Sequence, residues 1–323
     1  MIWTAFTTAD LEHAKREGLE LEKSEALRLS GCGTLETAPI VASFSECVVC
    51  WNALTPLQSS MQLELRVQIE GRWSPYLRLA HWSDDPNQNS SYNESAEGVR
   101  LETDTVVCAT LAQALQLRVH LEGAVLTGLV ASFAVQPSSS QPQRSSAWGL
   151  VLDVPRLSQM VYPDGGRVWC SPTSTTMLLG YWEQKLGRPL AHSVPEAARA
   201  VWDKRYGGAG NWAFNMAYAS RSGLRAYVAH LGGFAEAEAL VARGIPLALS
   251  IGWREGELAG APIGHSSGHL VVLCGFTPTG DPVVNDPAHP SDAAVRVVYK
   301  RAELERAWLL HSKGVVYVLE PSS

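Results

Sequence analysis

The sequence lacks the surplus of basic residues that a nucleic-acid-binding protein needs. Its 323 residues include 26 lysines and arginines against 32 aspartates and glutamates, which gives a net charge of −6. Residues 1–145 account for the excess of acidic residues, with 10 basic against 17 acidic. Residues 146–323 have 16 basic against 15 acidic. Because binding to phosphates depends on lysine and arginine, we expect no nucleic-acid partner.

Long apolar runs are also missing. No stretch approaches the roughly 20 consecutive apolar residues of a membrane-spanning helix. Residues 1–18 have no cationic segment leading into an apolar one, which is the pattern of a secretory signal. We therefore expect no membrane partner and a cytoplasmic protein, with secretion as the alternative for a chain that has lost its signal.

Cysteine is scarce for a disulfide framework, with six residues in the whole chain. The one close pair is Cys47 and Cys50, and it lacks both a second CxxC and a histidine pair at zinc spacing. Buried thiols are therefore favoured over a metal site. No metal or organic cofactor is expected elsewhere in the chain.

A polar segment divides the chain. Residues 137–146 contain proline, serine, glutamine and arginine but no aliphatic side chain, a composition typical of a linker. The sequence thus predicts an accessory domain at residues 1–137, a linker at 138–146 and a second domain at 147–323.

The N-terminal domain has the pattern of antiparallel strands. Apolar and polar residues alternate over 61–70 and again over 115–122, as in strands with one buried face. Further strands are expected near residues 40–51, 73–82, 98–107 and 128–135. Short strands separated by turn residues favour an all-β sandwich or jelly roll.

The C-terminal domain mixes helices and strands. A helix is predicted to begin after Cys170, because Pro172 is tolerated in a first turn. Other helices are expected near 195–203, 234–243 and 301–310. Strands are expected at 247–253, 269–276, 282–285, 295–299 and 315–319. A helix followed by a largely antiparallel sheet indicates an α+β fold.

Cys170 and His269 are the leading candidates for chemistry. A thiol at a helix N-terminus is stabilised as the thiolate, which is the attacking species in thiol catalysis. His269 opens the apolar run 270–276, so that a strand would hold its backbone while its ring lies at the end of the strand. Such a ring could act as the base.

Two neighbouring residues compete to orient that ring. Asp286 ends the apolar piece 282–286, and its carboxylate could meet the second ring nitrogen if the two strands pair. Asn285 is the competitor, but adjacent strand residues point to opposite faces. Gln159 is the candidate donor for an oxyanion, with a polar surface glutamine as the alternative.

A rival motif is Gly264-His-Ser-Ser-Gly268, which fits the G-x-S-x-G nucleophile elbow of serine hydrolases. In that interpretation Ser266 is the nucleophile, Asp286 the acid, and His289 or His311 the base. The elbow needs a strand before the serine and a helix after it. Here the preceding residues resemble a loop and the apolar strand follows.

Gln159, the segment Trp169-Cys-Ser-Pro-Thr, Gly268-His-Leu-Val-Val and Val284-Asn-Asp-Pro together resemble the C39-like peptidase family of papain-like fold. The resemblance covers roughly residues 150–320. It implies an oxyanion Gln159, a nucleophilic Cys170, a base His269 and an orienting Asp286, acting on a peptide or another amide. Ser171-Pro172 stands where many relatives have Cys-Gly. The chain shows no Walker A motif, so the leader-peptide substrate of exporter-linked relatives is not expected.

The N-terminal half is similar to the β-rich domain that precedes the peptidase domain in some bacterial members. Its tryptophans at 51, 73 and 82 could line a glycan- or protein-binding surface, although a place in the core is more usual for them. The non-enzymatic alternative to a hydrolase is that the peptidase-like half is a catalytically degenerate scaffold and the β-domain does the binding. The glycine-rich segment 206–212 could flank a substrate or be an ordinary connection.

Overall fold

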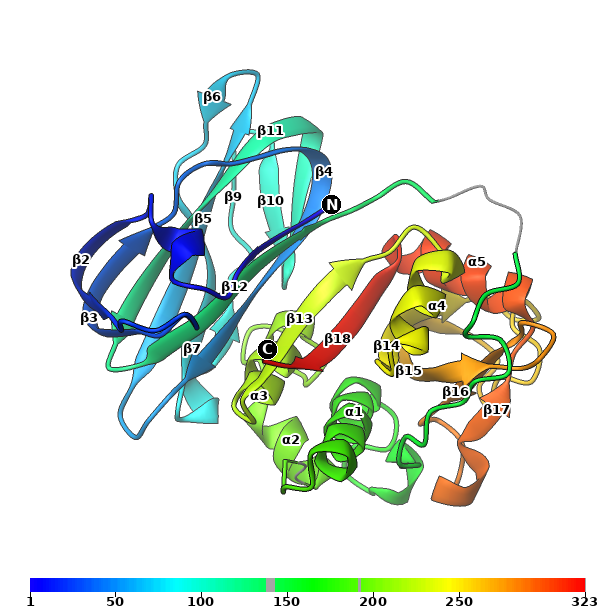
Figure 1. Ribbon diagram of the computed structural model, residues 1–323. Coiled ribbons are helices and arrows are strands. Elements are labelled where there is room, and N and C mark those ends of the chain that lie inside the picture. The colour runs from blue at the N-terminus through cyan, green and yellow to red at the C-terminus, as the bar shows by residue number, and fades with distance from the viewer. Residues whose placement is uncertain (138–142, 191–192, 323) are drawn as a thin grey trace. The chain divides into compact units, whose positions relative to one another are not determined.

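The computed structural model describes residues 1–137, 143–190 and 193–322, and its elements group into two units (Figure 1). Unit 1 comprises Met1–Ala134 together with Ala200–Arg221. Unit 2 comprises Val135–Arg199 together with Ser222–Ser323. Residues 138–142 of the predicted linker lie outside the described residues.

Unit 1 is built from strands. Its strands are β1 (Ile2–Ala5), β2 (Lys15–Leu21), β3 (Leu29–Glu36), β4 (Ile40–Leu54), β5 (Ser60–Ile69), β6 (Arg72–Trp73), β7 (Leu77–Ser83), β8 (Ser90–Ser91), β9 (Ser95–Ala96), β10 (Val99–Glu102), β11 (Thr105–Glu122) and β12 (Val125–Phe133). In β5, Met61, Leu63, Leu65 and Val67 are buried, while the residues between them are partly exposed. The alternation in the sequence therefore follows the two faces of the sheet.

Within the described residues the strands form one hydrogen-bonded network of twelve, and its main path runs β2-β3-β12-β4-β11-β5-β7-β8. The long strand β11 joins the network together. Its first half pairs with β4 and β10, and its second half pairs with β3 and β5. The register shifts between Val107 and Ala112, where bulges bend the strand. A β-rich domain was predicted correctly, but the two separate sheets of a sandwich are merged here.

A segment from the second half of the sequence packs into unit 1. Helix α3 (Trp212–Ser220) brings Phe214 against Trp51 and Trp82, with ring centroids 5.8 and 5.2 Å apart. The guanidinium of Arg221 lies 5.0 Å from the centre of the Trp82 ring and donates a hydrogen bond of 2.8 Å to Thr55 Oγ1. The hydrophobic core of unit 1 is completed by this segment.

Asp203 anchors the same segment. Its Oδ1 accepts backbone N–H groups from Ser91, Arg205 and Tyr206 at 2.9, 3.0 and 3.2 Å. Its Oδ2 accepts the side-chain amide of Asn211 at 2.8 Å. The glycine-rich segment 206–212, itself part of unit 1, is thus held by hydrogen bonds at one end and continues into α3 at the other.

Unit 2 carries the mixed helices and strands that the sequence predicts. Its helices are α1 (Cys170–Leu186), α2 (Val194–Ala200), α4 (Phe234–Ala242) and α5 (Arg301–Ser312). Its strands are β13 (Leu224–His230), β14 (Leu247–Trp253), β15 (Ser266–Phe276), β16 (Pro282–Asn285), β17 (Arg296–Val298) and β18 (Val315–Pro321). Among the described residues these form a six-stranded sheet in the order β13-β18-β14-β15-β16-β17, and every pairing is antiparallel.

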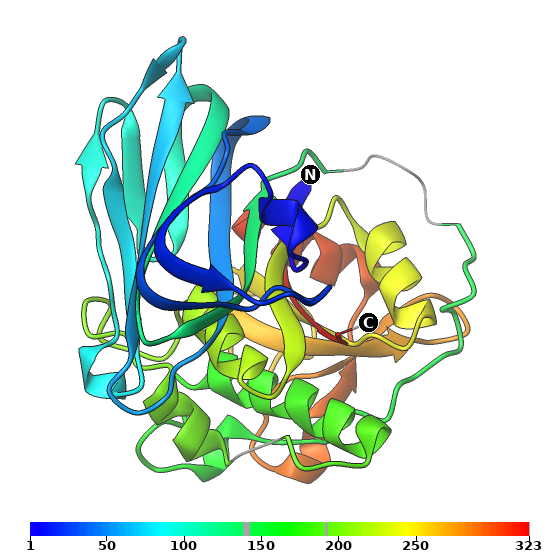
Figure 2. The ribbon, with the colours of Figure 1, turned by 60° about the vertical axis from the view of Figure 1, so that its left-hand side comes forward.

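Helices cover both faces of this sheet. Figures 1 and 2 show α1 on one face, with α4 and α5 on the other. Helix α1 ends at Gly187, whose φ of 64° is a left-handed conformation that glycine adopts without strain. In the part of the chain that is described, no helix is both long and apolar enough to cross a membrane.

The structure also shows where the sequence-based predictions fell short. Strands β1, β2, β3 and β13 and helix α3 were not expected. The sequence of β2, Lys-Arg-Glu-Gly-Leu-Glu-Leu, lacks a regular alternation of apolar and polar residues, because the strand is largely exposed and a bulge interrupts its register. For Trp51 and Trp82 the core position that the sequence favoured is confirmed, since both are fully buried, and the alternative of a surface role is wrong. Trp73 is half-buried beneath the guanidinium of Arg66, 4.9 Å from its ring centre.

Phe214→Ala tests whether segment 200–221 stabilises unit 1. Removing a fully buried ring between two tryptophans should cost about 3–5 kcal/mol of stability. The loss should appear as reduced hydrogen-exchange protection of strand β4, measured by mass spectrometry. Leu57→Ala is the control, because Leu57 is 86% exposed. Unchanged protection of β4 in Phe214→Ala would contradict this packing role.

Candidate active site

Cys170 is the first residue of α1. The helix begins without a side-chain cap at Trp169, and Pro172 occupies its first turn, where a missing N–H costs nothing. The thiol is half-buried. Burial raises the pKa of Cys170, but a hydrogen bond and the charge of His269, together with the backbone N–H groups of Leu270 and Ser171, lower it below its ordinary value. The thiolate of Cys170 therefore forms more readily than that of a free cysteine.

His269 lies in β15, opposite Ile251 of β14. The residue is 3% exposed, and the ring of Trp253 approaches its ring edge-on at 5.9 Å. Nε2 lies 2.7 Å from Oδ1 of Asp286. Burial lowers the pKa of His269, but the charge and hydrogen bond of Asp286, with a further contribution from Cys170, raise it to about 10. The ring is thus held as an imidazolium.

Asp286 follows directly after β16 and is fully buried. Its Oδ1 also accepts the backbone N–H of Ala288 at 3.0 Å, and its Oδ2 accepts the hydroxyl of Tyr299 at 2.6 Å. Burial raises the pKa of Asp286, but the charge and hydrogen bond of His269 and the bonds from Tyr299 and Ala288 lower it below the ordinary range. The carboxylate therefore remains ionised in an apolar setting.

Asn285 points away from this cluster. Its side-chain amide donates to the carbonyl of Pro155 at 2.9 Å, and its Oδ1 accepts Nε of Arg296 at 2.8 Å. The expectation that Asn285 and Asp286 lie on opposite faces is confirmed. Between the two, the structure brings Asp286 to the histidine.

Two family models match the chain. The model of the Peptidase C39-like family matches residues 151–316, and a model described as the Peptidase C39 N-terminal domain matches residues 3–136. The chain belongs to the Peptidase C39-like family. The first match contains every member of the cluster around Cys170.

Solved structures resemble this C39-like chain only distantly. A crystal structure from Bacillus anthracis, described as a C39-like peptidase, shares 18% identity, with a TM-score of 0.40 over 54% of this chain and 98% of that one. The CBM22 and GH10 modules of a Clostridium thermocellum xylanase, solved with xylohexaose, share 8% identity, with a TM-score of 0.18 over 48% of this chain and 30% of theirs. No curated protein matches.

Gln159 lies near the C39-like cluster but is engaged elsewhere. It begins a short 3-10 turn (Gln159–Val161) and is 3% exposed. Its backbone N–H donates to the carbonyl of Pro287, next to Asp286, and its side-chain amide donates to the carbonyl of Gly166 at 3.0 Å. The amide NH₂ has one further proton to donate. A role for Gln159 at the oxyanion remains a prediction.

The serine-hydrolase interpretation is wrong about local structure. Ser266 is the first residue of β15, so a strand and not a helix follows it. Its hydroxyl accepts the backbone N–H of Gly268 at 3.1 Å. Asp286, the acid that this interpretation requires, is already bound to His269. The strand-turn-helix of a nucleophile elbow is not formed at this position.

Sequence reasoning missed two side chains that support the cluster. Tyr299 follows β17 and holds Oδ2 of Asp286, while Tyr317 of β18 shares a hydrogen bond of 2.7 Å with Ser171, beside Cys170. Both tyrosines lie in or at the end of strands that were predicted. The order of strands in the sheet, which places them near α1 and β16, was not contained in the hydrophobic pattern.

Asp286→Asn tests the electrostatic linkage within the cluster. The substitution keeps the shape of the side chain but removes the charge that raises the pKa of His269, so the pKa of Cys170 should rise. Iodoacetamide labelling of Cys170 at pH 6 should then slow by about tenfold or more, since one pKa unit changes the thiolate fraction tenfold. Mass spectrometry of the Cys170 peptide measures the rate.

The exposed Cys32 is an internal reference for reagent and pH. Asp153→Asn is the matched control, because Asp153 is exposed. Equal labelling rates of Cys170 in the wild type and in Asp286→Asn would show that the charge of Asp286 does not reach the thiol.

Proposed function

We propose that the chain is a cysteine-dependent hydrolase of peptide or related amide bonds, with a papain-like catalytic unit. The nucleophile is Cys170, the general acid and base is His269, and Asp286 orients the ring. The observation that supports this most is the buried 2.7 Å contact between Nε2 of His269 and Oδ1 of Asp286. It leaves Nδ1 of the ring for the sulfur of Cys170.

The resting state is a thiolate paired with an imidazolium. The sulfur attacks the carbonyl carbon of the substrate and forms a C–S bond, while the carbonyl electron pair moves to the oxygen. The backbone N–H of Cys170 and the side chain of Gln159 donate to this oxyanion. When the C–N bond breaks, His269 gives its proton to the leaving amine, and a thioester remains.

Water completes the cycle. His269, now neutral, takes a proton from the water as its oxygen attacks the thioester. Cleavage of the C–S bond releases the carboxylic acid and restores the thiolate beside the imidazolium. Asp286 stays ionised throughout, because its role is to hold the tautomer and stabilise the charged ring.

A degenerate scaffold is the competing function, and the acidic thiol argues against it. A protein that only binds has no need to keep a half-buried cysteine below its ordinary pKa at the start of a helix. Perturbed titratable groups of this kind concentrate at functional sites.

Cys170→Ala should abolish hydrolysis of a fluorescent peptide library while leaving the circular dichroism spectrum unchanged. Loss of a nucleophile costs about 10⁵-fold or more in kcat, and loss of the orienting acid costs less, so Asp286→Asn should retain more activity than Cys170→Ala. Ser266→Ala is the matched control and should keep wild-type turnover. Equal activity of the wild type and Cys170→Ala would defeat the proposal.

A further inference from the structure

A hollow lies in unit 1, on the solvent face of β2, β3 and β11. Glu17 stands opposite Thr34, and Thr34 stands opposite His120, so these side chains share one face. The alternate residues Leu35 and Val119 are fully buried on the other face. The hollow has a volume of about 430 Å³, within the size range of small-molecule sites.

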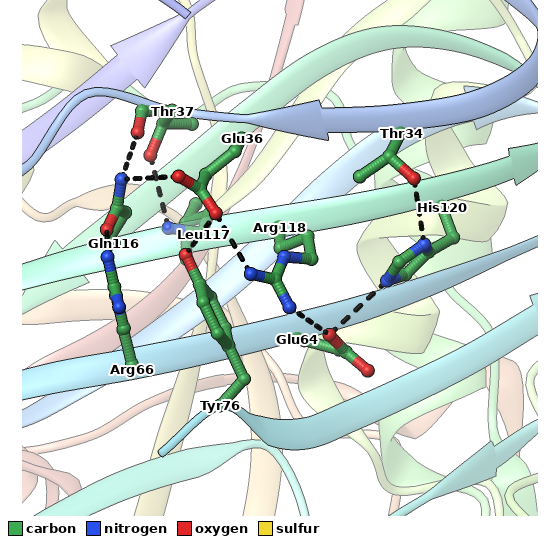
Figure 3. Close-up of polar contacts among 10 residues, drawn as sticks. All are labelled: Thr34, Glu36, Thr37, Glu64, Arg66, Tyr76, Gln116, Leu117, Arg118 and His120. Atoms are coloured by element: carbon green, nitrogen blue, oxygen red, sulfur yellow. Dashed lines mark hydrogen bonds and ion pairs between the residues drawn. The ribbon is translucent and has the colours of Figure 1, made fainter. Parts of the chain in front are cut away.

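The floor of this hollow is organised around Glu36 (Figure 3). Its Oε2 accepts Nη2 of Arg118 at 3.0 Å and the hydroxyl of Tyr76 at 2.9 Å. The Arg118 guanidinium also lies 3.5 Å from the centre of the Tyr76 ring. Burial raises the pKa of Glu36, but Tyr76 and Arg118 lower it below its usual value. The floor is thus an ionised and well-held pair.

The same network continues along β11. Oε2 of Glu64 lies 3.5 Å from Nη1 of Arg118 and 3.3 Å from Nε2 of His120, and Nδ1 of His120 lies 3.1 Å from Oγ1 of Thr34. Arg118, Glu64 and His120 each have two polar partners in this network, and Thr34 has one. A floor that is fixed in advance loses little conformational entropy when a ligand binds.

The rim differs from the floor. Lys15 and Glu17 line the hollow on the same face as Glu36 and Thr34, their partners in β3, and both are exposed. Within the described parts of the chain, their side chains make no hydrogen bond or ion pair. Lysine offers only donors, and an ionised glutamate offers only acceptors. The rim therefore presents spare groups of both kinds above a fixed floor.

The charges that line the hollow balance. Lys15 and Arg118 contribute two positive charges, and Glu17 and Glu36 contribute two negative charges. A strongly charged ligand would be attracted by one set and repelled by the other. A hydroxyl group is both donor and acceptor, so a neutral molecule with many hydroxyls can use both sets at once.

We propose that this hollow binds a neutral carbohydrate. Cross-strand ion pairs at the surface add little to stability, and partly buried carboxylates carry a desolvation penalty. Stabilising the sheet alone does not call for a fixed polar floor beneath a rim of unpaired groups. Such an arrangement is the one expected of a preorganised binding site.

The test uses the full chain carrying Cys170→Ala, which makes it independent of any hydrolase activity. The chain is applied to an array of neutral oligosaccharides together with sulfated and phosphorylated ones, and the strongest neutral binder is titrated by calorimetry. Lys15→Ala with Glu17→Ala removes the rim groups without changing net charge. Loss of these hydrogen bonds should weaken Kd by about tenfold.

Glu20→Ala with Lys23→Ala is the matched control, because both residues are exposed, lie in or near β2 and leave net charge unchanged. It should alter Kd by less than about twofold. Three results would overturn the proposal: no binding to any neutral glycan on the array, a preference for the anionic glycans, or equal weakening by the two double variants.

Discussion

The buried contact between His269 and Asp286 is the interaction on which the catalytic account depends. An ionised carboxylate in an apolar interior is costly unless it is paired and hydrogen-bonded. Here the imidazolium, a backbone N–H and the Tyr299 hydroxyl supply those partners. These partners keep Asp286 ionised. The charge of Asp286 raises the pKa of His269, and the charge of His269 in turn lowers the pKa of the Cys170 thiol. Four segments distant in sequence have to converge for this to happen.

Much of this convergence could be predicted from the sequence. The apolar run after His269 and the short run before Asp286 indicate two strands, and their antiparallel pairing brings the ends of both to one edge. Cys170 could be placed at a helix start because Pro172 belongs in a first turn. The alternation of Asn285 and Asp286 implied that only one of the two could reach the ring, and the structure shows that it is Asp286. Local patterns served best for Cys170, which begins α1, and for Asp286, which directly follows β16, whereas His269 is the fourth residue of β15 and not its first.

What the sequence could not supply depends on long-range packing. The segment carrying Phe214 and Arg221 lies between α2 and α4 of unit 2 in the chain, yet completes the core of unit 1. The hydrophobic pattern of a segment does not show that it packs into a unit other than that of its neighbours in the chain. The sequence favoured a core position for Trp51 and Trp82, but it did not show that their ring partner, Phe214, lies in that segment. The sequence proposed Gln159 as the oxyanion donor, but it could not show that the side-chain amide donates to the carbonyl of Gly166.

The most direct test of the central claim is titration of Cys170 by the ultraviolet absorbance of its thiolate, taken as the difference between the wild type and Cys170→Ala. The account predicts a midpoint below the pKa of about 8.5 of a free cysteine. A midpoint at or above that value would show that His269 and Asp286 do not sustain a thiolate, and would contradict the assignment of Cys170 as the nucleophile.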